Sequence, residues 1–124
     1  MSNCLNAEKI DAKQGLVYFI TSDSIGEDKE IGKQLMNSFF QSLIQIENQP
    51  EAILLMNSGV KLASENEEII VHLKELESKG VKILSCGFCL KKYNLLETLS
   101  AGIITNMYQA VQFLHQATNV ITIR

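Results

Sequence analysis

Two cysteines three positions apart, Cys86 and Cys89, are the residues of this chain best suited to covalent chemistry. The segment Cys86-Gly87-Phe88-Cys89 follows an apolar stretch that predicts a buried strand, and we expect a short helix to begin close to it. Backbone N–H groups and the positive end of a helix favour a thiolate over a thiol, and Lys91 and Lys92 add positive charge nearby. A thiolate at neutral pH is a nucleophile for sulfur exchange or covalent catalysis.

Three kinds of chemistry use such a pair. A structural zinc site needs four ligands, and the chain offers only this pair together with His72 and His115, each on a predicted helix, so we expect no metal. Thioredoxins, which the motif resembles, place a proline opposite the motif from later in the chain, whereas the single proline here, Pro50, comes earlier. Transfer of sulfane sulfur, in which one thiolate accepts a sulfur atom as a persulfide, fits best, and dithiol redox chemistry stays as a weaker alternative.

Packing is the competing interpretation of every free cysteine, because cysteine is often a small buried hydrophobe. The position just after a strand favours a functional role for Cys86. Cys89 lies between Phe88 and Leu90, which leaves packing and function evenly balanced. Cys4 lies in a polar segment and is interpreted as incidental.

The elements that must position these thiols follow from the apolar pattern. Residues recurring at helical spacing predict a long helix from Glu27 to Ile44, a second one through Leu76, a short amphipathic segment near 90–99 and a last one from Met107 to Leu114. Continuous apolar strands alternating with amphipathic helices indicate an α/β fold with a parallel sheet covered on both faces. The five predicted strands are Leu16–Ile20, Ala52–Met56, Val81–Leu84, Ile103–Ile104 and Val120–Ile123.

In a parallel sheet, ligands bind outside the carboxyl ends of the strands. Small or polar residues follow the strands at that edge, and we predict that a substrate site there includes Ser22, Asp23, Asn57, Ser58, Gly59, Thr105 and Asn106. Ordinary structural roles compete with this prediction. Asp23, with Glu27 and Asp28, also suits the start of the first helix, Asn106 suits an N-cap, and Ser58-Gly59 is common in turns.

Composition narrows the classes of function. The chain has 124 residues, 46% of them hydrophobic, and a formal charge of −3, so we expect one domain and no nucleic acid or anionic membrane as main partner. No apolar stretch approaches the ~20 residues of a membrane span, and residues 1–14 lack the apolar centre of a signal peptide. We therefore expect a cytoplasmic protein with reduced thiols. Neither GxGxxG nor a Walker loop occurs, and we expect no cofactor.

Four ordered segments carry a family resemblance: residues 22–27 (SDSIGE), 56–63 (MNSGVKLA), 76–90 (LESKGVKILSCGFCL) and 102–108 (GIITNMY). Together they resemble the C-terminal domain of YedF-like proteins, which are DsrE/F-like, sulfurtransferase-like proteins associated with selenium or sulfur metabolism. The resemblance implies a DsrE/F-like domain over residues 15–124, with a polar tail over residues 1–14. It also implies a three-layer α/β/α architecture, a five-stranded parallel sheet and a homo-oligomer.

The resemblance also indicates which residue carries sulfur. In sulfur-relay members the carrier cysteine sits just after the third strand, which corresponds to Cys86. YedF-like proteins begin with a TusA-like domain that holds a Cys-Pro motif, and residues 1–14 contain neither. We therefore expect either a TusA-like protein acting in trans or a chain that is a separated piece of a longer one.

The leading hypothesis is a small sulfur carrier or sulfurtransferase in a sulfur or selenium relay. A persulfide forms on Cys86 and passes from a donor protein to an acceptor protein, while Cys89 resolves or protects it. The alternative is a non-catalytic oligomeric module that binds a small ligand or a protein in the cleft at the carboxyl edge of the sheet.

Overall fold

The computed structural model describes residues 15–124, so the predicted polar tail and Cys4 lie outside the described residues. The strands are β1 (Leu16–Ile20), β2 (Ala52–Leu55), β3 (Lys82–Cys86), β4 (Ile103–Thr105) and β5 (Asn119–Ile123). The α-helices are α1 (Lys29–Leu43), α2 (Glu67–Ser78), α3 (Gly87–Lys92) and α4 (Met107–Gln116). Two 3₁₀ helices, η1 (Asn57–Ala63) and η2 (Leu96–Thr98), follow β2 and α3.

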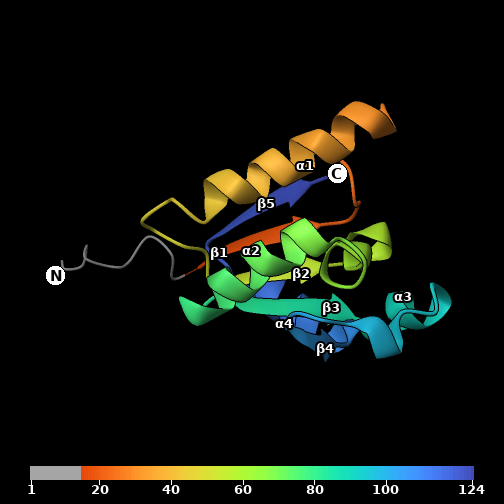
Figure 1. The fold of residues 1–124 in the computed structure, drawn as a ribbon. Coiled ribbons are helices and arrows are strands. Elements are labelled where there is room, and N and C mark those ends of the chain that lie inside the picture. Colours follow the sequence, from red (N-terminus) through yellow and green to blue (C-terminus); the bar gives the residue numbers. More distant parts are fainter. Residues whose placement is uncertain (1–14) are drawn as a thin grey trace, which may run out of the picture.

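All five strands form one parallel sheet in the order β4-β3-β2-β1-β5 (Figure 1). The chain moves by one strand at each of the first three crossovers and then returns through α4 to the opposite edge of the sheet. Because the strands are parallel, the ends of β1, β2, β3 and β4 all point to one side of the molecule. The predicted α/β class and the five-stranded parallel sheet are confirmed.

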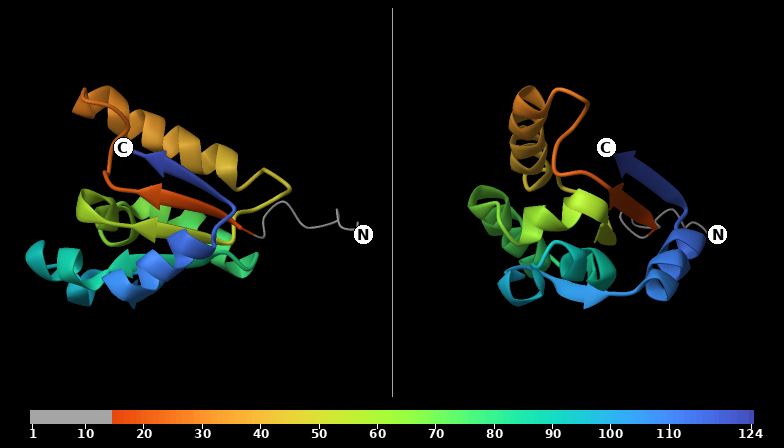
Figure 2. Two further views of the ribbon diagram at one scale, coloured as in Figure 1. Left: turned by 180° about the vertical axis from the view of Figure 1, so that it is seen from behind. Right: turned by 90° about the vertical axis from the view of Figure 1, so that its right-hand side faces the viewer.

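Helices cover the sheet in separate layers. Figure 2 shows α1 and α2 side by side on one face and α4 on the other, which is the predicted three-layer α/β/α arrangement. The central strand β2 is buried along its whole length, as expected for a parallel strand covered on both sides. The core is built from large apolar side chains that are fully buried, among them Met36, Phe40, Leu54, Ile69 and Leu73.

Local signals explain where the helices begin and end. Asp28 has an extended backbone, and its carboxylate accepts the N–H groups of Glu30 and Ile31 at 3.1 and 3.2 Å, so it is the N-cap of α1. Asn66 caps α2 in the same way through the N–H of Ile69. After α2 the chain turns at Gly80, whose φ of 96° suits glycine.

Several predicted boundaries are wrong. The helix α1 starts at Lys29, two residues after Glu27, because Asp28 is the N-cap and its side chain accepts the first N–H groups of the helix. The strand β3 continues through Ser85 and Cys86, and β4 continues through Thr105, because β3 and β4 remain paired up to Cys86 and Thr105. The Asn57-Ser58-Gly59 segment is the first turn of η1 rather than an isolated turn.

Candidate functional site

A cavity of about 530 Å3 opens where β3 and β4 end, and both cysteines of the CxxC motif line it. Its walls come from the end of β2, the start of α3, the β4–α4 junction and the first residue of α4. The lining is Met56, Cys86, Gly87, Phe88, Cys89, Ile104, Thr105, Asn106 and Met107. None of these residues carries a formal charge, so the thiols face a largely apolar space.

Cys86 is both the last residue of β3 and the N-cap of α3. Its sulfur accepts the backbone N–H of Cys89 at 3.4 Å, and the residue is only 5% exposed. Pairing of Cys86 with Thr105 on β4 fixes the backbone on the other side. The thiol is therefore held in place by the sheet and reached through the cavity rather than from the open surface.

Cys89 lies one turn into α3 and is half-buried, so it is the more exposed thiol of the pair. Its sulfur accepts the backbone N–H of Asn57 at 3.1 Å. Burial raises the pKa of the Cys89 thiol, the hydrogen bond with the Cys86 thiol raises it further, and the Asn57 N–H lowers it. The backbone N–H of Cys89 also donates to the Cys86 sulfur, so the two cysteines are neighbours, and the raised pKa of Cys89 favours its protonated form at neutral pH.

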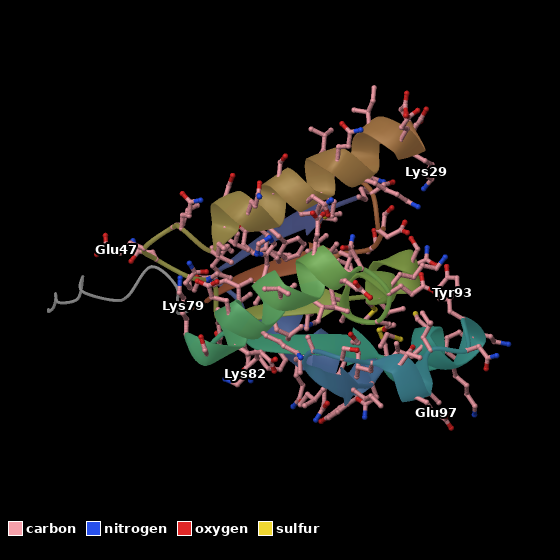
Figure 3. All side chains as sticks on the ribbon, viewed as in Figure 1. Lys29, Glu47, Lys79, Lys82, Tyr93 and Glu97 are labelled. Carbon is pink, nitrogen blue, oxygen red and sulfur yellow. The ribbon has the colours of Figure 1, made fainter. Side chains whose placement is uncertain are left out.

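The backbone N–H of Asn57, which donates to Cys89, is held in place by the local conformation of the chain and by a side-chain contact. Asn57 follows β2 with a φ of 52°, a left-handed conformation that asparagine tolerates better than most residues. Its side-chain oxygen accepts the Tyr93 hydroxyl at 3.3 Å, and the Lys61 ammonium lies 4.6 Å from the centre of the Tyr93 ring. Tyr93 lies at the end of the molecule where η1 and α3 meet (Figure 3).

The two lysines expected near the thiols have other neighbours. The Lys92 ammonium lies 5.5 Å from the centre of the Phe88 ring. Lys91 lines a separate cavity of about 330 Å3 together with residues of η2. The thiols therefore face backbone donors and apolar side chains rather than the ammonium groups.

Two of the predicted substrate residues line the cavity with the cysteines. Thr105 is buried at the end of β4, and its hydroxyl donates to Gln109 at 2.8 Å. Asn106 caps α4 by accepting the Gln109 N–H at 2.9 Å. Thr105 and Asn106 thus line the cavity and also make hydrogen bonds that stabilise the start of α4.

The other predicted residues lie at the same edge of the sheet but outside the cavity lining. The Ser58 hydroxyl accepts the N–H of Asp23, and the Ser22 hydroxyl accepts the N–H of Ser24. Asp23 lines a separate cavity of about 470 Å3 beside α1 and α2. Gly59 is buried, and a Cβ at this position would lie 2.5 Å from the Ile20 carbonyl oxygen.

Sequence reasoning missed the apolar walls of the cavity and the Tyr93 contact. Met56, Phe88, Ile104 and Met107 all line the cavity, and Phe88 and Met107 are 69% and 59% exposed. Their signal in the sequence is that each directly adjoins a predicted site residue. Nothing in the spacing of Tyr93 and Asn57, 36 positions apart, indicates their contact.

Over residues 15–124, no group of three or more His, Cys, Asp and Glu side chains is arranged to hold a metal ion. Within the same range, no helix has both the length and the apolar character needed to cross a membrane.

The sequence matches the model of one protein family, the DsrE/DsrF-like family, over residues 16–123. No curated protein matches the chain.

Several solved structures share the fold at low sequence identity. The YchN protein of E. coli is 17% identical with a TM-score of 0.60, covering 88% of this chain and 98% of that one. The conserved protein of unknown function BT1422 from Bacteroides thetaiotaomicron is 13% identical with a TM-score of 0.62, covering 98% and 100%. The protein of unknown function MTH1491 from Methanobacterium thermoautotrophicum is 17% identical with a TM-score of 0.62, covering 86% and 96%.

Proposed function

Because the chain belongs to the DsrE/DsrF-like family, which is generally associated with sulfur relay, we propose that it carries sulfane sulfur as a persulfide on Cys86. The thiolate of Cys86 attacks the outer sulfur of a donor persulfide, R–S–SH. The bond between the two donor sulfurs breaks, a new bond joins the transferred sulfur to Cys86, and the donor leaves as the thiolate R–S⁻. The reverse reaction, with an acceptor thiolate as nucleophile, unloads the carrier.

The observation that carries this proposal is the uncharged cavity that holds both thiols. A persulfide is lost when small thiols reach it, and the apolar side chains of Met56, Phe88 and Ile104 offer water no hydrogen-bonding partner beside the reacting sulfur. The cavity also has room for an added sulfur atom beside Cys86. The backbone N–H of Cys89 at 3.4 Å supplies a hydrogen-bond donor for the attacking thiolate.

The test is mass spectrometry of the intact chain after incubation with a small persulfide donor. We expect a gain of one sulfur atom that peptide mapping places on Cys86 and that Cys86→Ser abolishes. The matched control is Cys4→Ser, the same substitution at a cysteine outside the CxxC motif of the sequence, which should gain sulfur as the wild type does. Absence of sulfur on Cys86 in a folded protein would sink the proposal.

We further propose that the chain is a YedF-like member of the family with a TusA-like protein as its partner in trans. Supporting this are the segments 56–63 and 76–90, whose residues resemble YedF-like C-terminal domains. Incubation of persulfide-loaded protein with a purified TusA-like protein should move the sulfur to the cysteine of the partner. Repeating the loading with a selenium donor tests selenium carriage, because a selenium adduct has a different mass and isotope pattern.

The compartment follows from the same chemistry. We propose a cytoplasmic location, since Cys86 and Cys89 are free thiols and a reducing compartment keeps them available. Fractionation of cells that produce a tagged chain checks this proposal.

A second candidate function is an oligomeric binding module, favoured by the apolar surface around the cavity mouth. Phe88, Ile104, Met107 and Tyr108 are all exposed, Tyr108 by 73%. Exposed apolar patches commonly mark interaction sites, and a second copy of the chain is the occupant we propose. Light scattering should show a homo-oligomer that Met107→Asp shifts toward the monomer. An oligomeric wild type that takes up no sulfur but binds a small ligand or a protein would favour this module over the carrier, whereas a monomeric wild type would contradict it.

A further inference from the structure

The carrier role of Cys86 leaves the second thiol of the motif unexplained. Cys89 lines the same cavity, is more exposed than Cys86 and donates its backbone N–H to the Cys86 sulfur at 3.4 Å. A thiol that only filled space would need no polar partner, yet the Cys89 sulfur accepts a backbone N–H from Asn57 at 3.1 Å. The position of Cys89 therefore suits a reacting group better than a packing group.

The Asn57 contact comes from outside α3 and fixes the Cys89 sulfur relative to the sheet. Asn57 is the first residue of η1 and follows β2 in a left-handed conformation. Its side chain is tied to Tyr93, which ends α3. The N–H that faces Cys89 is thus held from both sides, and it can support negative charge on that sulfur while Cys89 reacts.

We propose that Cys89 is the resolving nucleophile that discharges the persulfide of Cys86 and releases the carried sulfur as hydrosulfide. The inference rests on the proposed carrier function. The Cys89 thiolate attacks the inner sulfur, Cys86 Sγ, and a bond forms between the two cysteine sulfurs. The bond between Cys86 Sγ and the outer sulfur breaks, and the outer sulfur leaves with the electron pair as HS⁻.

The geometry selects the inner sulfur as the target. The backbone N–H of Cys89 donates to Cys86 Sγ at 3.4 Å, which keeps Cys89 beside the inner sulfur, whereas a sulfur added to Cys86 extends into the cavity. Which sulfur is attacked decides the product, because attack on the outer sulfur would move it to Cys89 without releasing it. Hydrosulfide is also a weaker base than a cysteine thiolate and therefore the better leaving group.

The product of this step is a Cys86–Cys89 disulfide, which blocks the next loading. Its reduction takes two electrons and two protons, and a dithiol reductant supplies both by thiol–disulfide exchange and is itself oxidised to a disulfide. A complete cycle therefore consumes one donor persulfide and one dithiol and yields hydrosulfide, the donor thiol and an oxidised dithiol.

The experiment loads the full chain with inorganic polysulfide, removes the excess, and follows protein mass and trapped sulfide over time. The wild type should lose the added sulfur, release sulfide and finish two hydrogens lighter than the reduced chain, with the disulfide mapped to Cys86 and Cys89. A dithiol should then restore both thiols and permit a second loading. Cys89→Ser should keep its persulfide, with loss slowed about tenfold or more because intramolecular attack is removed. Cys4→Ser is the matched control and should resolve as the wild type does.

The outcomes separate the two proposals. Equal rates of sulfur loss in the wild type and Cys89→Ser, or a wild type that never forms the disulfide, would overturn the resolving role while leaving Cys86 as a carrier. Failure of Cys86 to load in every variant would overturn the carrier function and this inference together. Cys89→Ala, checked for folding by circular dichroism, repeats the measurement without a hydroxyl at position 89.

Discussion

Replacing Gly59 with alanine tests whether this glycine is needed for close packing against β1. Gly59 is buried in η1, and an added Cβ would lie 2.5 Å from the Ile20 carbonyl oxygen and 3.2 Å from its carbonyl carbon. That carbonyl already accepts the N–H of Met56 at 3.0 Å, so the obstructing atoms are fixed backbone rather than a flexible side chain. Relief requires η1 to move away from the sheet by several tenths of an ångström.

The expected cost follows from two opposing effects. Overpacking of this kind destabilises by about 1–3 kcal/mol. Alanine also lowers the conformational entropy of the unfolded chain, which stabilises the folded state by about 0.4–1 kcal/mol. The net loss should be about 0–2.6 kcal/mol, or about 1.3 kcal/mol at the midpoints of both ranges, and for a domain of this size each 1 kcal/mol lowers Tm by about 4 °C. The assay is urea and thermal unfolding followed by circular dichroism, with the two midpoints compared between Gly59→Ala and the wild type.

The control is Gly80→Ala, which separates close packing from conformation. Gly80 has a φ of 96° with open space around its Cβ position, so alanine there should cost about 1 kcal/mol through backbone strain alone. Only Gly59→Ala should alter the alkylation rate of Cys89, because a shift of η1 moves the Asn57 N–H. A Gly59→Ala protein as stable as the wild type, with unchanged Cys89 alkylation, would refute the packing argument.

Three further predictions concern the Cys89 thiol, the helix α3 that carries it and the Asp28 cap of α1. Alkylation of Cys89, mapped by peptide mass spectrometry, should reach its half-maximal rate at a higher pH than for a free cysteine, because burial raises the Cys89 pKa and the thiolate is the reactive form; an inflection at or below the free-cysteine value would contradict this. Leu90→Ala should cost about 2–5 kcal/mol in urea unfolding, because the fully buried Leu90 anchors α3, whereas the exposed Leu96→Ala should cost far less. Asp28→Ala should cost about 0.5–2 kcal/mol of stability by removing the α1 cap, and persulfide loading on Cys86 should stay unchanged. Loss of loading in the folded variant would mean that Asp28 takes part in the site and contradict its purely structural role.

The sequence predicted the fold well because its signals are local. Alternating apolar strands and amphipathic helices indicate a parallel sheet, and cap residues such as Asp28 and Gly80 act on their own neighbours in the chain. The strand ends were harder to predict. Ser85 and Cys86 have no strong strand preference of their own, whereas the β-branched Thr105 does. All three belong to strands because β3 and β4 pair with each other that far.

The candidate site was only partly predictable. The sequence alone determined that the CxxC motif lies at the carboxyl end of the third strand and that polar residues lie at the ends of its neighbours, since order along the chain fixes which edge of a parallel sheet they reach. Which of those residues share a cavity with the thiols depended on tertiary structure. Thr105 and Asn106 line it, whereas Ser22, Asp23 and Ser58 hydrogen-bond or pack elsewhere along the same edge.

The surroundings of the thiols were decided entirely by tertiary packing. Asn57 faces Cys89 across 32 positions of sequence, and burial rather than nearby lysines governs the Cys89 pKa. Both facts depend on how η1 and α3 meet above the sheet. Spacing along a chain determines which chemistry is available, but only the folded arrangement fixes the distances, water exclusion and hydrogen-bond donors on which the reactivity of a thiol depends.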